Sequence, residues 1–330
     1  MKVAILGAGA MGSLVGAHIK KGGGEVYFVD IYKEHMDRIR EKGITMELET
    51  DTGIQVETVL VDGAVTSAET IGACDAVIVL VKCVDSDAAV EMNQALFGKD
   101  TVVITLQNGV GGADILARHF DNDHLGLGVL KSSANILGPG RIMGRARFPN
   151  SPKGVYFSPI NFKTPYINVY YELEKLLTAG GMPAECNERT EEFVWDKLVT
   201  NVMINGIAAL LQLSGEDVGS HEDGRILQNE LGREACEVAN AKGIKLDYSH
   251  YVHNRPNSEP FDRSKVKVFH YVSAVFDSYN KRRTEMDFLC GAIVKEGQKY
   301  GVKTPYNEAV WRLVRLMQDN YDNKYKPLED

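Results

Sequence analysis

The chain lacks the residue patterns that hold disulfides and metal ions. Its eight histidines form no His-x-x-x-His or similar cluster, and it contains no Cys-x-x-Cys pair. The five cysteines are widely spaced, at Cys74, Cys83, Cys186, Cys236 and Cys290. We therefore predict no metal site, and we interpret the cysteines as reduced thiols of a cytosolic protein.

Charge and hydropathy exclude other partners. The formal net charge of −8 would repel polyphosphate, so general nucleic-acid binding is not expected. No continuous apolar run approaches the roughly 20 residues of a membrane-spanning helix. The chain enters a strand at once, so we expect no signal peptide. With 330 residues, 44% of them hydrophobic, the composition predicts a cytoplasmic globular protein of two domains without a membrane partner.

The most informative pattern is a glycine-rich segment after the first predicted strand. KVAILGAGAMGS is an apolar run, then Gly7-x-Gly9-x-x-Gly12, then small residues suited to a helix. Gly7 allows a tight turn, Gly9 lets the backbone approach a pyrophosphate, and Gly12 lets the helix pack against the sheet. The helix N-terminus adds free N–H donors. We therefore predict dinucleotide binding by Gly7, Gly9, Ala10, Met11 and Gly12.

A second apolar run, EVYFVD, ends in an acid that bears on the cofactor. Asp30 follows the glycines at the expected interval of about 20 residues, where a carboxylate accepts hydrogen bonds from an adenosine ribose. Its charge would repel a 2′-phosphate. Asp30 therefore favours NAD(H), with NADP(H) as the alternative because Lys33 lies close by in the sequence.

The first half of the chain alternates strand and helix patterns. Near-continuous apolar runs such as AVIVLV and TVVITL are typical of parallel strands buried on both faces. This order predicts an α/β fold that begins with a Rossmann-type doubly wound sheet in a domain of residues 1–187. Within it we expect helices at 33–42 and 86–96, a hairpin in 44–61, and antiparallel strands in 125–144 and 153–160.

The character of the sequence changes near residues 186–189. The remaining residues, 188–330, are expected to form an all-α domain. An irregular loop is expected at 247–264, which contains HNRPNSEPFD. Helical patterns cover 191–213, 226–242, 265–279, 285–300 and 305–320.

Two polar residues stand where buried strands are expected to end. Lys82 closes AVIVLVK, and Asn108 follows VVITLQ. Ligands of open α/β sheets bind outside the carboxyl ends of the strands, and an unpaired lysine is poor core material. Both are therefore candidate cofactor-site residues. The alternatives are a solvated strand-end lysine and an ordinary Asn-Gly turn.

A polar stripe runs along an otherwise apolar helix in the second half. Lys197, Asn201 and Asn205 are spaced i, i+4, i+8, so they lie on one helix face. Asparagine is an indifferent helix former. The stripe therefore indicates polar partners or a ligand, and the alternative is a solvent-facing surface.

Ser273 and Glu285 are a further candidate pair. One straight helix would separate them by about 18 Å, too far to share a small substrate. Thr284-x-x-Asp287 resembles a helix start, so we predict a break that would let both side chains face one site. Taken alone, Glu285 would be a first-turn acid favoured by the helix dipole.

Together these segments resemble the ketopantoate reductase (2-dehydropantoate 2-reductase) family over nearly the whole chain. The likeness rests on GAGAMGS, LVK at Lys82, LQNGVG at Asn108, WDKLVTNVMIN at 195–205 and RRTEMDFLCG at 282–291. It implies an oxidoreductase of pantothenate biosynthesis that reduces a 2-keto acid, 2-dehydropantoate, to pantoate with a nicotinamide cofactor. In that case the keto acid would bind between the two domains.

The resemblance also implies roles for single residues. Lys197 would be the general acid that protonates the carbonyl oxygen, and Glu285 would orient the substrate and the lysine. Lys82 would lie beside the nicotinamide. The substrate's hydroxyl and carboxylate would be held by Asn108, Asn201, Asn205 and Ser273.

The chain departs from the family pattern in three places. It has DI at 30–31 where an arginine is usual, NGIAA at 205–209 in place of Asn-Pro-Leu-Thr-Ala, and LSGE at 213–216 in place of Pro-Asn-Gly-Glu. A lost asparagine changes how a substrate hydroxyl is recognised. The alternatives are an NADH-dependent relative that acts on another 2-keto acid, and a non-catalytic dinucleotide sensor. Exposed apolar residues on the C-terminal helices would be compatible with a homodimer.

Overall fold

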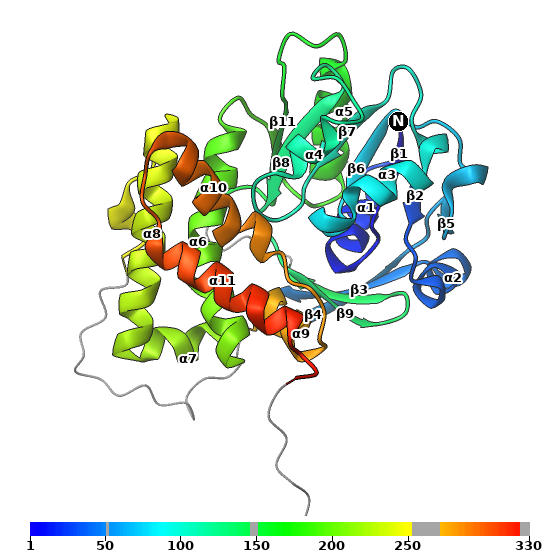
Figure 1. Cartoon of the computed structure of the whole chain (residues 1–330). Helices are drawn as coiled ribbons and strands as arrows, with labels where there is room; N and C mark the ends of the chain where they lie inside the picture. The colour runs from blue at the N-terminus through cyan, green and yellow to red at the C-terminus, as the bar shows by residue number, and fades with distance from the viewer. Residues whose placement is uncertain (51–52, 146–150, 253–270, 324–330) are drawn as a thin grey trace, which may run out of the picture. The chain divides into compact units, whose positions relative to one another are not determined.

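The computed structural model describes residues 1–50, 53–145, 151–252 and 271–323. An α/β portion with a mostly parallel sheet comes first, and a helical portion follows it along the chain (Figure 1). This is the fold class that the alternation of buried strands and helices predicted.

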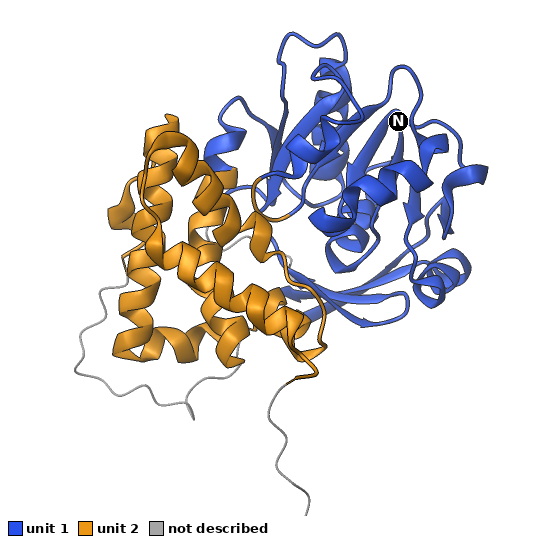
Figure 2. Cartoon of the chain, viewed as in Figure 1, with its two compact units in different colours: residues 1–107, 111–193 blue, residues 108–110, 194–330 orange. Residues whose placement is uncertain are grey.

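The described chain divides into two compact units (Figure 2). Unit 1 comprises Met1–Gln107 and Gly111–Phe193. Unit 2 comprises Asn108–Val110 together with the chain from Val194 onward, whereas the predicted second domain begins at residue 188. Asn108 therefore belongs with the helical unit, although only Leu106 and Gln107 separate it from a strand of unit 1 that ends at Thr105.

Unit 1 contains two sheets and the helices that cover them. Its strands are β1 Lys2–Leu6, β2 Glu25–Val29, β3 Ile44–Thr50, β4 Gly53–Val59, β5 Gly63–Val65, β6 Ala76–Val79, β7 Val102–Thr105, β8 Leu125–Leu130, β9 Ala134–Gly138, β10 Arg141–Arg145, β11 Val155–Pro159 and β12 Ala184–Cys186. Its helices are α1 Ala10–Lys21, α2 Lys33–Lys42, α3 Ser86–Met92, α4 Gly112–Leu116 and α5 Ile167–Ala179.

The large sheet has the strand order β12-β11-β8-β7-β6-β1-β2-β5. β1 pairs in parallel with β2 on one side and with β6 on the other, and β6 pairs in parallel with β7. This is the predicted doubly wound arrangement. Because parallel strands share a direction, the residues that follow β1, β2 and β6 leave the sheet at the same edge.

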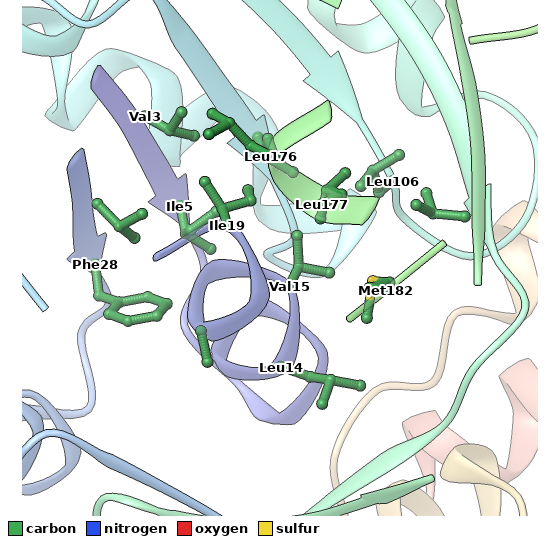
Figure 3. Close-up of a cluster of buried hydrophobic side chains, with 14 of the residues drawn as sticks. Val3, Ile5, Leu14, Val15, Ile19, Phe28, Leu106, Leu176, Leu177 and Met182 are labelled. Carbon is green, nitrogen blue, oxygen red and sulfur yellow. The ribbon is translucent and has the colours of Figure 1, made fainter. Parts of the chain in front are cut away.

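Alternate residues of each central strand bury opposite faces of the large sheet. Ile5 and Phe28 pack into one core with residues of α1 and α5, such as Leu177 (Figure 3). Leu6 packs into a second core that includes Val90 of α3. Both faces are therefore covered, which explains why the strands read as continuous apolar runs.

The small sheet has the order β4-β3-β10-β9 and packs on α1. Met46 of β3 and Ile142 of β10 join the same core as Leu14 of α1. α1 also contacts β1 and β2 of the large sheet. The helix that follows the glycine segment is thus held by strands of both sheets.

Strand pairing differs in part from the expectation for 125–144 and 153–160. β8 is parallel to β7, because α4 carries the chain back before β8 begins, and only its pairing with β11 is antiparallel. β9 and β10 are antiparallel, as expected, and β10 also pairs in parallel with β3. β3 and β4 form the expected hairpin on either side of residues 51–52, which lie outside the described residues.

The helix predicted at 86–96 is shorter in the structure. α3 ends at Met92, and a 3₁₀ turn, Gln94–Leu96, follows. Between them the side chain of Asn93 accepts a hydrogen bond from the backbone of Ala68 and donates one to the carbonyl oxygen of Ala89. These bonds satisfy the amide at the helix end and stop the helix there.

Unit 2 is helical, and its core is built around α6. Its elements are α6 Thr190–Leu211 (whose first residues belong to unit 1), α7 Gly215–Ser220, α8 Glu222–Lys242, the 3₁₀ turn Tyr248–His250, α9 Ser273–Tyr279, the 3₁₀ turn Met286–Phe288, α10 Cys290–Tyr300 and α11 Pro305–Asp319. Trp195, Val199 and Val202 of α6 are fully buried in one core with side chains of α8, α10 and α11.

α6 is unusually long and apolar. Among the described residues, it is the one helix that could cross a membrane by length and composition alone, although Glu191, Glu192, Asp196 and Lys197 interrupt its apolar sequence. Within its most apolar window, 56% is buried inside the protein. Its apolar character follows from its place in the core of unit 2.

Other helix boundaries in unit 2 also differ from the predicted ones. α7 was not predicted, and α8 begins at Glu222, where His221 caps the backbone N–H of Asp223, and not at residue 226. The segment predicted as a helix from 285 begins with a 3₁₀ turn, and α10 begins only at Cys290. Residues 253–264 of the predicted loop and 265–270 of the predicted helix lie outside the described residues.

The buried His18 predicts a pH dependence of stability. Burial lowers the pKa of His18, whose Nδ1 donates a hydrogen bond to the carbonyl oxygen of Gly180 at 2.9 Å. The unfolded chain takes up a proton near the ordinary imidazole pKa of about 6.5, and the folded chain only at lower pH. The free energy of unfolding therefore falls as the pH decreases below about 6.5.

His18→Asn keeps a donor near that position but does not titrate. We expect the wild type to lose more free energy of unfolding between about pH 7.5 and pH 5.5 than the variant does, as measured by urea denaturation. An equal loss in both proteins would contradict the assignment of this pH dependence to His18.

Candidate functional site

The loop between β1 and α1 is pressed against its surroundings at two glycines. Gly7 has a φ of +101°, and a Cβ at this position would lie 2.2 Å from the backbone nitrogen of Val81. A Cβ on Gly12 would lie 2.0 Å from the carbonyl oxygen of Gly7. The loop is therefore held against the residues after β6 and folded onto the first turn of α1, an arrangement that only glycine permits.

Gly9 is different, because its surroundings are open. Apart from Gly9 itself and the adjoining residues Ala8 and Ala10, no described part of the protein comes within 4 Å of a Cβ built there, and the backbone conformation is one that any residue adopts. Gly9 is the N-cap of α1, and no described side chain caps this helix end. Open space beside uncapped N–H groups, which include those of Ala10 and Met11, fits a pyrophosphate. Binding itself remains a prediction.

Asp30 directly follows β2 and is half-buried. Its Oδ1 accepts a hydrogen bond from the backbone N–H of Tyr32 at 2.9 Å, and a carboxylate has further acceptor positions for ribose hydroxyls. The next residue, Ile31, is 85% exposed. The segment that follows β2 therefore presents an apolar side chain to solvent beside the Asp30 carboxylate.

Lys82 opens a 3₁₀ turn, Cys83–Asp85, after β6 and is half-buried. The backbone beside it is held by Gln107, which is 8% exposed and which the sequence analysis did not single out. Gln107 Nε2 donates to the carbonyl oxygen of Val81 at 2.7 Å and to Ser86 Oγ at 2.8 Å. A glutamine that closes an apolar strand was the signal for this contact, because a buried amide needs partners.

In unit 2, Lys197 and Asn108 are joined directly. Lys197 Nζ donates a hydrogen bond to Asn108 Oδ1 at 2.8 Å, and both side chains are half-buried. The segment of Asn108 is anchored where Val110 N–H donates to the carbonyl oxygen of Phe288 at 2.9 Å. Gly109, with a φ of +90°, lets this approach happen, since a Cβ there would lie 2.2 Å from the same oxygen.

The two asparagines that follow Lys197 along α6 are not fully exposed to solvent. Asn201 is half-buried, and Asn205 is only 7% exposed. The alternative of a solvent-facing stripe is therefore wrong for Asn205. α6 carries amide groups into the interior of unit 2, where polar groups need partners.

The predicted break between Ser273 and Glu285 is present. Ser273 is exposed and begins α9, which ends at Tyr279. Glu285 is half-buried and directly precedes the 3₁₀ turn Met286–Phe288. Glu285 thus lies three residues before Phe288, the residue that anchors the Asn108 segment, whereas Ser273 lies on the surface.

The predicted capping arrangement of Thr284 with Asp287 is wrong. Thr284 Oγ1 accepts a bond from the backbone N–H of Met286 at 3.3 Å. The carboxylate of Asp287 instead accepts a bond from Trp311 Nε1 at 2.7 Å. The indole of α11 is an equally good donor and is supplied by packing that the local sequence does not reveal.

The chemistry of these residues is that of proton donation and amide recognition. Lys197 supplies an ammonium group, and Asn108, Asn201 and Asn205 supply amides. Among the residues that the structure describes, no group of three or more His, Cys, Asp or Glu side chains could hold a metal ion. An ammonium group on a buried helix can stabilise and protonate an oxygen on which negative charge develops.

Comparison with known families matches both portions of the chain. Residues 3–151 match the family model described as ketopantoate reductase PanE/ApbA, and residues 190–318 match the model of its C-terminal portion. The first match contains the glycine loop, Asp30, Lys82 and Asn108. The second contains Lys197, as well as the other candidate residues of the helical unit.

Relatives and solved structures extend over nearly the whole chain. A 2-dehydropantoate 2-reductase of Streptococcus pyogenes serotype M18 is 28% identical over 325 residues, which cover 96% of this chain and 98% of the relative. The structure of a D-mandelate dehydrogenase with NADH and anilino(oxo)acetate has a TM-score of 0.81 at 26% identity, covering 97% and 99% of the two chains. A PanE/ApbA family ketopantoate reductase from Ralstonia eutropha has a TM-score of 0.79 at 27% identity and covers 97% and 99%.

Two glycine substitutions test the loop. Gly9→Ala places a methyl group in open space, so we expect a protein of unchanged thermal stability whose affinity for NADH falls about tenfold or more. Gly12→Ala is the matched control, because its methyl group collides with the Gly7 carbonyl oxygen and lowers the stability itself. Fluorescence titration with NADH and thermal denaturation measure the two effects. Wild-type affinity in Gly9→Ala would contradict the loop's role.

Proposed function

Because the chain belongs to the ketopantoate reductase PanE/ApbA family, we propose that it reduces the carbonyl group of a 2-keto acid, with 2-dehydropantoate as the first candidate. It is an oxidoreductase of this class, and the family depends on a pyridine nucleotide. This sets aside the non-catalytic sensor considered above. The observation that carries the proposal is the hydrogen bond from Lys197 Nζ to Asn108 Oδ1.

In the proposed reaction, a bound nicotinamide cofactor would supply the hydride that reduces the carbonyl carbon. The carbonyl oxygen then gains negative charge, and the Lys197 ammonium stabilises and protonates it. Asn108 accepts a hydrogen bond from the lysine through a neutral oxygen, which directs Nζ without competing for its proton. Glycines 7, 9 and 12, with Ala10, Met11, Asp30 and Lys82, would hold the cofactor in unit 1.

We assign the remaining candidate residues of unit 2 to the substrate. Asn201 and Asn205 would donate hydrogen bonds to its polar groups, since buried amides are costly unless they are paired. Glu285 would orient the lysine and the substrate. Ser273, which is exposed at the start of α9, would meet the substrate carboxylate.

A second candidate function is the reduction of a different 2-keto acid. Ser214 stands where the resemblance leads us to expect an asparagine, and it is fully buried. Its hydroxyl caps α7 by accepting a bond from the backbone N–H of Asp217 at 3.0 Å and donating one to Asp217 Oδ2 at 2.7 Å. A side chain engaged in this way supplies no amide to a substrate hydroxyl. The similarity to a D-mandelate dehydrogenase also favours testing aromatic 2-keto acids.

Steady-state reduction of 2-dehydropantoate, branched 2-keto acids and phenylglyoxylate distinguishes the two candidates. The first predicts the highest kcat/KM for 2-dehydropantoate. The second predicts the highest kcat/KM for one of the 2-keto acids that lack the hydroxyl group of 2-dehydropantoate. A protein that binds the cofactor but reduces none of these compounds would contradict both.

The cellular setting completes the proposal. All five cysteines are free thiols in the structure, consistent with a reducing compartment. We therefore propose that the enzyme acts in the cytoplasm on a small molecule, without a nucleic-acid or membrane partner. The homodimer remains a prediction.

Substitution of Lys197 tests its role as the acid. Lys197→Ala should lower kcat by roughly 10²–10⁴-fold, with the Kd for the cofactor unchanged. Lys197→Arg should remain impaired, because a guanidinium keeps the charge but does not release a proton near neutral pH. Leu211→Ala is a control in the same helix, since Leu211 is 60% exposed. Near-normal turnover of Lys197→Ala would contradict the assignment.

The residues after β2 predict a preference for NADH. Without an arginine, and with the charge of Asp30, the kcat/KM should be about tenfold or more higher with NADH than with NADPH. Asp30→Asn combined with Ile31→Arg should reverse the preference, because it removes the repulsion and supplies a cation. Asp30→Asn with Ile31→Gln is the uncharged control. A wild type that prefers NADPH would show that Asp30 does not decide the cofactor.

A further inference from the structure

A buried histidine lies beside the glycine loop and was not among the candidate residues. His35 is on α2 and is fully buried, and its ring stacks on Tyr32 with 5.6 Å between the ring centroids. Its Nδ1 lies 2.9 Å from the backbone nitrogen of Gly140, and its Nε2 lies 3.1 Å from Ser13 Oγ. All of these residues belong to unit 1.

The groups at the two ends of this chain of hydrogen bonds determine which atom donates and which accepts at each step. The backbone N–H of Gly140 can only donate, so His35 Nδ1 accepts and the proton of the neutral ring is on Nε2. At the other end the carbonyl oxygen of Ala8 can only accept, so Ser13 Oγ donates to it at 2.9 Å. Ser13 Oγ therefore accepts the proton of His35 Nε2. An imidazolium could not accept from Gly140 and would break the chain.

The bonds connect two segments that a dinucleotide would use. Ala8 stands between Gly7 and Gly9 in the predicted pyrophosphate loop. His35 is reached from Asp30, the predicted ribose acceptor, through Tyr32, whose N–H is bonded to Asp30 and whose ring stacks on the imidazole.

The far end of the chain of bonds is anchored in the small sheet. Gly140 is in the β9–β10 turn, with a φ of +70°, and its carbonyl oxygen accepts a bond from the backbone N–H of Thr45, on β3, at 2.8 Å. The histidine is therefore tied to backbone that belongs to a paired sheet and does not depend on the ligand.

We propose that His35 is a positioning residue for the dinucleotide: through Ser13 it holds the pyrophosphate loop in a fixed relation to the ribose-binding segment after β2. This proposal rests on the proposed function, because it needs a dinucleotide at the loop. It assigns to this chain a determinant of cofactor affinity that does not touch the cofactor.

The residue type fits the task. A neutral imidazole accepts at one ring nitrogen and donates at the other in one rigid plane, so it can bridge Gly140 and Ser13. Burial is the largest influence on the pKa of His35 and lowers it, whereas the nearby Asp30 carboxylate raises it to a smaller extent. The net shift is downward, so the ring is neutral near pH 7.

The test measures the Kd of NADH by fluorescence titration in the full-length protein. His35→Ala and Ser13→Ala should each raise the Kd of NADH about tenfold. This factor corresponds to the loss of one hydrogen bond whose net free energy is near the top of the usual range. The double variant should be no weaker than either single variant, because both break the same chain. His35→Gln, with an amide donor near the Nε2 position, should recover part of the affinity.

His18→Ala is the matched control. It removes another buried histidine of unit 1. His18 lies near the C-terminal end of α1, where it bonds to Gly180 and not to the glycine loop. We expect it to lower the thermal midpoint but to leave the Kd for NADH within about twofold of the wild type.

Kinetics separate positioning from a general structural role. In His35→Ala the KM for NADH should rise about tenfold, while kcat at saturating NADH and the KM for the 2-keto acid stay the same. Unchanged affinity in folded His35→Ala and Ser13→Ala, or additive losses in the double variant, would overturn the proposal. Failure of the wild type to bind NADH or NADPH would instead overturn the proposed function.

Discussion

A lysine that protonates a carbonyl oxygen must be held in place while it keeps its proton. In this protein Lys197 is carried by α6, the helix around which the core of unit 2 is built, and its Nζ donates to the neutral side-chain oxygen of Asn108. Asn108 is in turn anchored through Val110 to the turn at Phe288. The position of the proposed acid thus depends on the packing of the whole helical unit, and Asn201 and Asn205 share the same rigid helix.

Unit 1 meets a similar constraint by other means. Its glycine loop is fixed by close backbone approaches at Gly7 and Gly12, and by the hydrogen bonds through Ser13 and His35. Of the three glycines of this loop, Gly7, Gly9 and Gly12, only Gly9 faces open space. A loop that is already rigid loses little conformational entropy when a dinucleotide binds, so more of the interaction energy remains as affinity.

Local patterns predicted much of this, and long-range contacts explain the rest. The glycines, the buried strands and the stripe from Lys197 to Asn205 are visible in the sequence because their periodicity and spacing reflect local geometry. The parallel pairing of β8 and the grouping of Asn108 with unit 2 depend on segments far apart in the chain. The same holds for the bond between His35 and Gly140, which are 105 residues apart, so no local pattern could have revealed it.

The most direct test is to follow the hydride itself. A single turnover with NADH dideuterated at C4 and the 2-keto acid that the wild type reduces fastest should give a 2-hydroxy acid with one deuterium at C2. The same product should form roughly 10²–10⁴-fold more slowly in Lys197→Ala. Mass spectrometry of the product measures both quantities. A product without deuterium, or an equal rate in the variant, would contradict reduction by hydride transfer with Lys197 as the acid.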